Sequence, residues 1–143
     1  MEQSLLVTTI RRPWHWGIAV VTGPGQTEDF PEIEPGRPFC STSGALVIMV
    51  RHAQDVEDID HGFAEATVSI SLHQDEVTPD DGKQAIGEGI LSTPEGTLSV
   101  GDADMNVVVP AHKGMTQFLI SIEGPSDLSP EHVRVDLWPV VTS

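Results

Sequence analysis

Thr67-Val68-Ser69-Ile70-Ser71-Leu72 is the stretch of this chain that decides its fold class. Apolar side chains alternate with small polar ones, a period of two that is typical of a half-buried strand in an antiparallel sheet. The same alternation returns over residues 118–122 and over residues 133–137, where we expect Arg134 and Asp136 to occupy the open face. These three segments predict a sheet with one face on a core and one face in water.

Further runs of strand length are separated by 13 glycines and 11 prolines. Ala45 to Val50 is continuously apolar, which predicts a central strand buried on both faces. Thr93-Pro94-Glu95-Gly96 has proline and glycine where a tight hairpin turn favours them, which predicts that residues 97–100 are the return strand of a hairpin. Eight or nine strands at about ten-residue spacing predict an all-β fold, a single antiparallel β-sandwich or jelly-roll-like domain over residues 1–143. The remaining expected strands are residues 5–10, 16–22, 86–91, 97–100 and 105–109.

Two segments depart from this strand pattern. Val56, Ile59 and Phe63 have helical spacing, so we expect at most one short helix, over residues 53–63. Residues 23–38 are rich in proline, glycine and acidic residues and show no periodicity, which predicts a long surface loop. One short helix among many strands leaves the all-β prediction unchanged.

The charge of the chain is strongly negative, with 22 Asp and Glu against 7 Lys and Arg, a formal net charge of -15. Such a surface repels nucleic acid and anionic membranes, and it steers the protein toward a basic protein partner. Cys40 is the single cysteine, so no internal disulfide can form. With neither a signal peptide nor a membrane span recognisable in the sequence, we expect a cytoplasmic protein.

Two acidic clusters are the candidate partner-binding residues. The spacing of the first cluster does not fit a calcium-binding loop, which needs ligands at alternating positions and a glutamate at the twelfth. A solvated face that contacts a partner is therefore the better interpretation. The clusters consist of Asp55, Glu57, Asp58 and Asp60, and of Asp75, Glu76, Asp80 and Asp81.

No catalytic residue, metal ligand or cofactor site is predicted. The six histidines lack the spacing of a metal site, and no nucleophile elbow is present. One alternative is a cupin-like metal-dependent small enzyme, because residues 107–114 resemble the second half of a cupin, with His112 acting with His61 or His73. The first cupin motif is missing, and one histidine cannot hold a catalytic metal. A second alternative is a structural subunit of a larger assembly or a homo-oligomer.

Several features over roughly residues 56–138 follow a recognisable order. They are an acidic helix ending in His61-Gly62-Phe63-Ala64, the strands at 68–72 and 118–122, a turn at Pro94-Glu95-Gly96, and Pro110-Ala111-His112-Lys113-Gly114. This order of elements resembles the competence protein J family, known for an inhibitor of a DNA-entry nuclease. The resemblance implies a β-sandwich that acts by binding a protein, without a cofactor and without a catalytic residue. Together with the charge, it leads us to expect a non-enzymatic acidic protein-binding module, an inhibitor or immunity-like factor for a basic nuclease.

Overall fold

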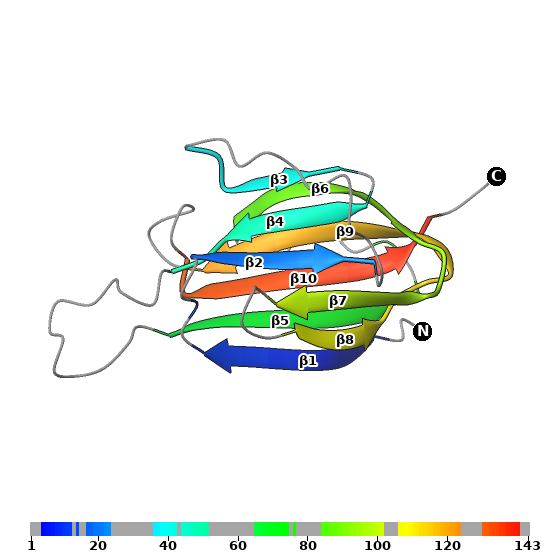
Figure 1. The fold of residues 1–143 in the computed structure, drawn as a ribbon, viewed down its shortest axis with the longest axis horizontal. Coiled ribbons are helices and arrows are strands. Elements are labelled where there is room, and N and C mark those ends of the chain that lie inside the picture. The colour runs from blue at the N-terminus through cyan, green and yellow to red at the C-terminus, as the bar shows by residue number, and fades with distance from the viewer. Residues whose placement is uncertain are drawn as a thin grey trace, which may run out of the picture.

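Two five-stranded sheets packed face to face make up the described part of the protein (Figure 1). The computed structural model describes residues 4–12, 14, 17–23, 36–42, 44–51, 65–74, 76, 84–101, 106–123 and 130–140. No helix occurs among these residues, and so none that could cross a membrane. The strands are β1 (Ser4–Arg12), β2 (Ile18–Thr22), β3 (Phe39–Ser41), β4 (Ala45–Met49), β5 (Ala66–His73), β6 (Gln84–Thr93), β7 (Thr97–Gly101), β8 (Asn106–Pro110), β9 (Gly114–Glu123) and β10 (His132–Pro139).

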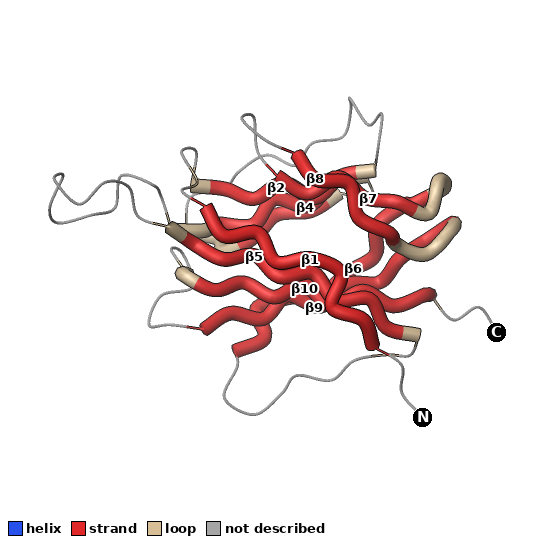
Figure 2. Tube along the Cα trace, turned by 90° about the horizontal axis from the view of Figure 1, so that it is seen from below, coloured by secondary structure: helices blue, strands red, loops and turns tan. Residues whose placement is uncertain are grey.

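The strand order is β1-β5-β10-β9-β6 in what we call the first sheet and β3-β4-β2-β7-β8 in the second sheet. Figure 2 shows the two sheets as separate layers. Every pairing is antiparallel except that of β5 with β10, in which His132 lies beside Thr67 and Leu137 beside Leu72. The predicted all-β sandwich is confirmed. The one parallel pairing could not be predicted, because side-chain alternation is the same in both strand directions.

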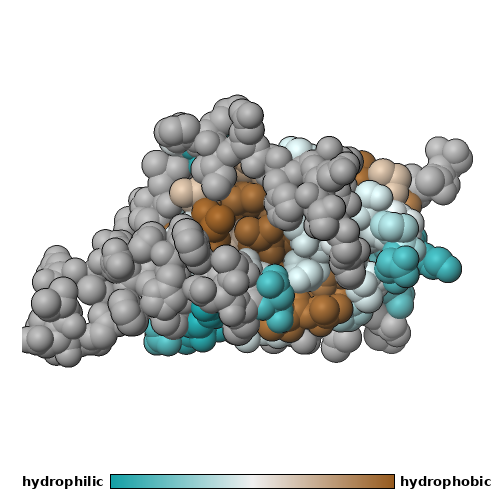
Figure 3. Space-filling model, viewed as in Figure 1, coloured by the Kyte–Doolittle hydropathy of each residue, from teal (hydrophilic) through white to brown (hydrophobic). Residues whose placement is uncertain are grey.

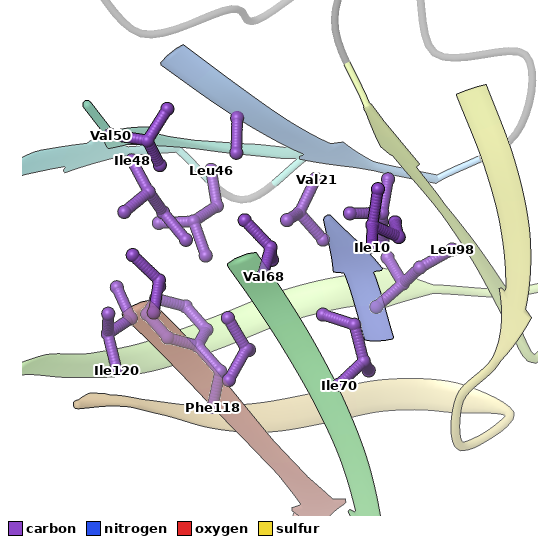
Figure 4. Packing of buried hydrophobic residues seen from close by; sticks show 14 of the residues in the cluster. Ile10, Val21, Leu46, Ile48, Val50, Val68, Ile70, Leu98, Phe118 and Ile120 are labelled. Carbon is purple, nitrogen blue, oxygen red and sulfur yellow. The ribbon is translucent and has the colours of Figure 1, made fainter. Parts of the chain in front are cut away.

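The core lies between the sheets and is built from the inward positions of both (Figure 4). Leu46 and Ile48 of β4 point toward Phe118 and Ile120 of β9 across this layer, and all four are fully buried. Alternation therefore places apolar side chains inward from both sheets, as the sequence predicts. The expectation that β4 is buried on both faces is also met, since its first four residues are buried.

Trp14 fixes the chain between β1 and β2. Its side chain is fully buried, and its Nε1 donates a hydrogen bond to the backbone oxygen of Ala66 at 3.0 Å. The guanidinium carbon of Arg12 lies 5.1 Å from the centre of the Trp14 ring, within the range of a cation–π contact. This tryptophan is therefore a structural anchor, while Trp16 lies outside the described residues.

Strand β6 has ten residues and is longer than the expected strand at 86–91, because its glycines make room for aromatic rings. A Cβ atom on Gly87 would stand 2.0 Å from Cε1 of Phe39, and one on Gly89 would stand 2.7 Å from Cζ of Phe118. Glycine usually weakens a strand, but it also marks places where another group approaches the backbone closely. Here the two glycines let rings from both sheets pack on β6.

A turn forms at residues 93–96, but the predicted hairpin is wrong, because β6 and β7 lie in different sheets and the turn connects them. The Gly96 nitrogen donates to the Thr93 oxygen at 3.0 Å, and Gly96 has a φ of 73°, which glycine adopts without strain. Beside the turn, the buried Thr93 hydroxyl donates to the backbone oxygen of His112 at 2.5 Å. The same hydroxyl oxygen lies 2.8 Å from the hydroxyl oxygen of Thr116. These bonds hold the corner between β6 and β9.

One strand was absent from the sequence prediction, and two expected segments are not described by the structure. The three-residue strand β3 was not predicted, because it is too short to show a period. The expected helix at 53–63 and residues 24–35 of the expected loop lie outside the described residues. Neither of these two expectations is tested by the fold.

Candidate functional site

Of the two acidic clusters, only Glu76 is described, and it is exposed. The other candidate residues, Asp55, Glu57, Asp58, Asp60, Asp75, Asp80 and Asp81, lie outside the described residues. The structure therefore does not show whether the clusters come together. They remain a prediction from the sequence.

The histidines proposed for a cupin-like site lie close together, but their hydrogen bonds are structural. Nε2 of His112 lies 2.9 Å from the backbone oxygen of His73. Because a carbonyl oxygen only accepts, this nitrogen carries the proton and cannot also ligate a metal. Nε2 of His73 lies 2.8 Å from Oδ1 of Asp136. His61 lies outside the described residues, and within the described ranges no three His, Cys, Asp or Glu side chains could hold a metal ion.

Asp136 lies on the outer face of the first sheet, but it is not open to water. It is only 3% exposed, whereas the sequence predicts an open face at this position. Oδ1 of Asp136 also accepts from Nε of Arg134 at 2.9 Å, so one carboxylate serves both Arg134 and His73. A buried carboxylate is tolerated when charged and polar partners surround it in this way. The prediction was wrong for Asp136 because a period of two reveals Arg134 on the same face but does not reveal His73, which comes from the neighbouring strand β5.

The rest of this outer face is a mixture of buried and charged positions. Trp138 is buried, and its Nε1 donates to Oε1 of Gln117 at 3.1 Å. Leu119 and Ser121 are buried as well, whereas Glu88 is exposed. The buried polar side chains on the outer face of the first sheet thus form hydrogen bonds largely with one another. Its strands also contain every Asp, Glu, Lys, Arg and His residue of the described strands: Arg11, Arg12, His73, Glu88, Glu123, His132, Arg134 and Asp136.

The second sheet has the opposite character, since none of its five strands contains Asp, Glu, Lys, Arg or His. Charged residues make up 20% of the whole chain, so their exclusion from an entire sheet is not a matter of composition. Alternation with the core positions turns Ile18 and Val20 of β2, Val47 and Met49 of β4, and Val108 of β8 away from the core. The outer face of this sheet is therefore uncharged, with apolar side chains over β2 and β4 and at Val108, while Thr97 and Ser99 of β7 are polar outward positions.

These outward side chains differ in how far they are covered. Val47 is buried, Ile18, Val20 and Met49 are half-buried, and Val108 is 65% exposed. Figure 3, viewed from this side, shows hydrophobic surface over β4 and β2 and again over β8. An antiparallel sheet that faces water normally carries polar side chains at these positions. We therefore take the outer face of the second sheet as the candidate functional surface.

Sequence reasoning missed this surface, although a signal for it is present. The segments 18–22, 45–49 and 106–110 contain no charged residue in a chain that is otherwise rich in them. The apolar run at residues 45–50 predicts a strand buried on both faces, and this prediction includes no outer surface. Only the pairing of β4, β2, β7 and β8 in one sheet shows that their outward positions form a common face.

Comparison with known proteins finds similarity in structure at low sequence identity. No protein-family model matches the sequence, and no curated protein matches it. The crystal structure of ComJ from Bacillus subtilis, described as an inhibitor of the DNA degrading activity of NucA, is similar with a TM-score of 0.64 and 13% identity, covering 98% of this chain and 99% of ComJ. The structure of crocagin biosynthetic gene J has a TM-score of 0.54 and 13% identity, covering 97% and 98% of the two chains. The chain is thus similar in fold to ComJ over almost its whole length, which confirms the resemblance expected from residues 56–138.

Proposed function

We propose that this chain is a non-enzymatic protein inhibitor that binds a basic nuclease and blocks its degradation of DNA. The observation that carries the proposal is the similarity to ComJ, whose described role is to inhibit the DNA degrading activity of NucA, over nearly the full length of both chains. A shared fold alone does not define a function, so the proposal also needs support from the physical properties of this chain.

The net charge of -15 supplies that support. A nuclease that acts on DNA must present cationic groups to the phosphate backbone. An acidic protein is steered toward the same cationic surface, and it does not compete with the nuclease for DNA. The chain then inhibits by occupying the surface that DNA needs, which requires no catalytic residue.

The test is degradation of plasmid DNA by a purified nuclease in the presence of this protein. Two nucleases serve as probes: NucA of Bacillus subtilis, and the nuclease most similar to it in the organism from which this chain comes. We expect the protein to stop degradation by the second nuclease at a fixed molar ratio and to form a complex with it on size-exclusion chromatography. The proposal is wrong if neither nuclease is slowed by a tenfold molar excess and neither forms a complex.

The acidic clusters are the proposed source of electrostatic steering. Long-range attraction is screened over about 8 Å at physiological salt. The association rate in stopped-flow experiments should therefore fall steeply as salt rises, while the dissociation rate changes less. Replacing Asp58 by Asn and Asp60 by Ser together should slow association. If the association rate changes neither with salt nor with this double substitution, the charge serves solubility alone.

A further inference from the structure

Each sheet of the sandwich has two edge strands, and an edge strand carries backbone groups that can pair with another chain. Natural edges are protected by a bulge, by charged side chains or by being short. Strand β1 has a register shift between Leu6 and Thr8 and ends in two arginines. Strand β6 has a shift between Ala85 and Gly87 and carries Glu88, and β3 has only three residues. Three of the four edges are therefore protected.

Strand β8 is the fourth edge and lies at the border of the second sheet (Figure 1). It has five residues, none of which is charged, and its register with β7 runs without a shift. Val108 at its centre is 65% exposed. Strand β1 contacts β8 from the core side, because it belongs to the other sheet, and this contact leaves Val108 open. Of the four described edges, β8 is thus the one that a further strand can join.

The backbone of Val108 faces this open edge. The Ala111 nitrogen donates to the Gly96 oxygen at 2.9 Å, which fixes the pattern of bonds between β7 and β8. Hydrogen-bonded and non-hydrogen-bonded pairs alternate along an antiparallel ladder. The pair of Val108 with Ser99 lies three positions along the ladder and is therefore not hydrogen-bonded. The N–H and C=O of Val108 point away from β7, toward the edge.

We propose that the edge of β8 pairs antiparallel with the same strand of a second copy of this chain, which gives a reversible dimer. The register is centred on Val108, and a two-fold axis passes between its two copies. The N–H of each Val108 then donates to the C=O of the other, and their exposed side chains lie beside each other. The two second sheets become one continuous sheet. This inference does not rest on the proposed function.

The sequence of β8 is complementary to itself. No charged side chain lies in β7 or β8, so the paired strands place no like charges opposite each other. In the symmetric register, Asn106 of one copy lies opposite Pro110 of the other. Because proline has no N–H, each of these two outer pairs provides at most one hydrogen bond. The strongest pairing is therefore at the centre of the strand, where the two copies of Val108 meet.

The small size of this contact determines the kind of dimer. Stable interfaces bury about 1,200–2,000 Å² and involve some 20–30 residues on each side, many more than the residues of one strand pair. Association should therefore be reversible and should be detected at high protein concentration. The protein remains monomeric when dilute.

The net charge of -15 opposes the approach of two copies at long range. This repulsion is screened over about 8 Å at physiological salt and over shorter distances as salt rises. The backbone bonds and the valine contact act at short range, so dimerisation should become tighter with salt. Binding to a basic nuclease should become weaker with salt, and the two kinds of association are thereby distinguished.

Substitutions at Val108 test the edge because its backbone makes no bond to β7. Val108→Pro removes the N–H that faces the edge, and proline is accepted at such a position of an edge strand. Val108→Lys keeps the N–H but places two positive charges opposite each other in the dimer. Val108→Thr keeps both the N–H and the shape. Met115→Lys is the matched control, since Met115 is 50% exposed in β9, which is not an edge strand.

The experiment is sedimentation-velocity ultracentrifugation of a concentration series, from low salt to about 0.5 M NaCl. We expect the wild type and Val108→Thr to dimerise, more tightly at high salt. Val108→Pro should dimerise about 30-fold more weakly, because both central bonds are lost, and Val108→Lys should also be weakened. Met115→Lys lowers the net negative charge as Val108→Lys does, so it should dimerise at least as tightly as the wild type. Thermal unfolding checks that each variant is folded, and Val108→Lys decides the test if Val108→Pro is not.

Several results would overturn the proposal. One is a wild-type protein that stays monomeric at its highest soluble concentration in high salt, and another is a dimer that neither Val108→Pro nor Val108→Lys weakens. If Met115→Lys weakens the dimer as much as Val108→Lys, the interface lies elsewhere. If the wild type is monomeric and Val108→Pro loses binding to the nuclease, the edge receives a strand of that partner instead. Failure to inhibit a nuclease changes none of these results, so the proposed function can fail separately.

Discussion

The outer faces of the two sheets differ in how their side chains are used. On the first sheet, Asp136 bonds to both Arg134 and His73, and Trp138 bonds to Gln117. On the second sheet the outward positions carry no charge, and Val108 is 65% exposed. The difference teaches that hydrogen bonds on the outer face of the first sheet contribute to the stability of the fold, whereas the second sheet has no charged side chain to pair. Substitutions should therefore reduce stability more on the first sheet than at Val108.

Removing the buried carboxylate should have the largest effect. Asp136→Ala leaves Arg134 and His73 without their shared acceptor, and breaking a buried charged pair costs about 3–5 kcal/mol. Because Arg134 is 31% exposed and can be rehydrated, we expect about 3 kcal/mol of lost unfolding free energy in urea denaturation. Glu88→Ala, an exposed position on the same face, should change it by less than about 0.5 kcal/mol. Equal effects of the two substitutions would contradict a structural role for Asp136.

The corner that joins the two sheets should show the next largest effect. Thr93→Val keeps the side-chain shape but removes the hydroxyl that bonds to His112 and Thr116. Thr116 can still donate to the His112 oxygen at 3.1 Å, so we expect a loss of about 1.5 kcal/mol in urea denaturation. Thr93→Ser keeps the hydroxyl and serves as the control. If the serine variant is the less stable of the two, packing rather than hydrogen bonding holds this corner.

A smaller loss is expected for the second polar contact on the first sheet. Trp138→Phe removes the bond from Nε1 to Oε1 of Gln117, which is worth about 1 kcal/mol. Thermal unfolding checks this, since about 1 kcal/mol shifts the midpoint by roughly 2–4 °C in a protein of this size. The effect should be much weaker in a Gln117→Ala background, where the acceptor is already missing. An unchanged effect in that background would assign the loss to packing.

The smallest effect on stability is expected on the second sheet. Val108→Thr replaces a methyl group by a hydroxyl at a 65% exposed position, so the unfolding free energy should change by less than about 0.5 kcal/mol. A loss of stability larger than that of Trp138→Phe would remove the difference between the two outer faces.

Sequence periodicity predicts the strands that are long enough to show it. The segments 68–72, 118–122 and 133–137 lie within β5, β9 and β10, and 45–50 overlaps β4. Strand β3 has three residues and shows no period, and β6 runs over residues 84–93, beyond the strand expected at 86–91. Periodicity describes only the residues within one segment of the chain. The need for glycine at position 87 comes instead from the ring of Phe39, which belongs to the other sheet.

The amino-acid sequence by itself determined the fold class, the inward side chains and the acidic net charge, because each depends on local alternation or on composition alone. Tertiary structure decided which outward positions share a face. Asp136 bonds to His73 because β5 lies beside β10, and the uncharged face exists because β4, β2, β7 and β8 lie in one sheet. Both depend on pairing between strands that are far apart in the chain, and side-chain period carries no information about which strands will pair.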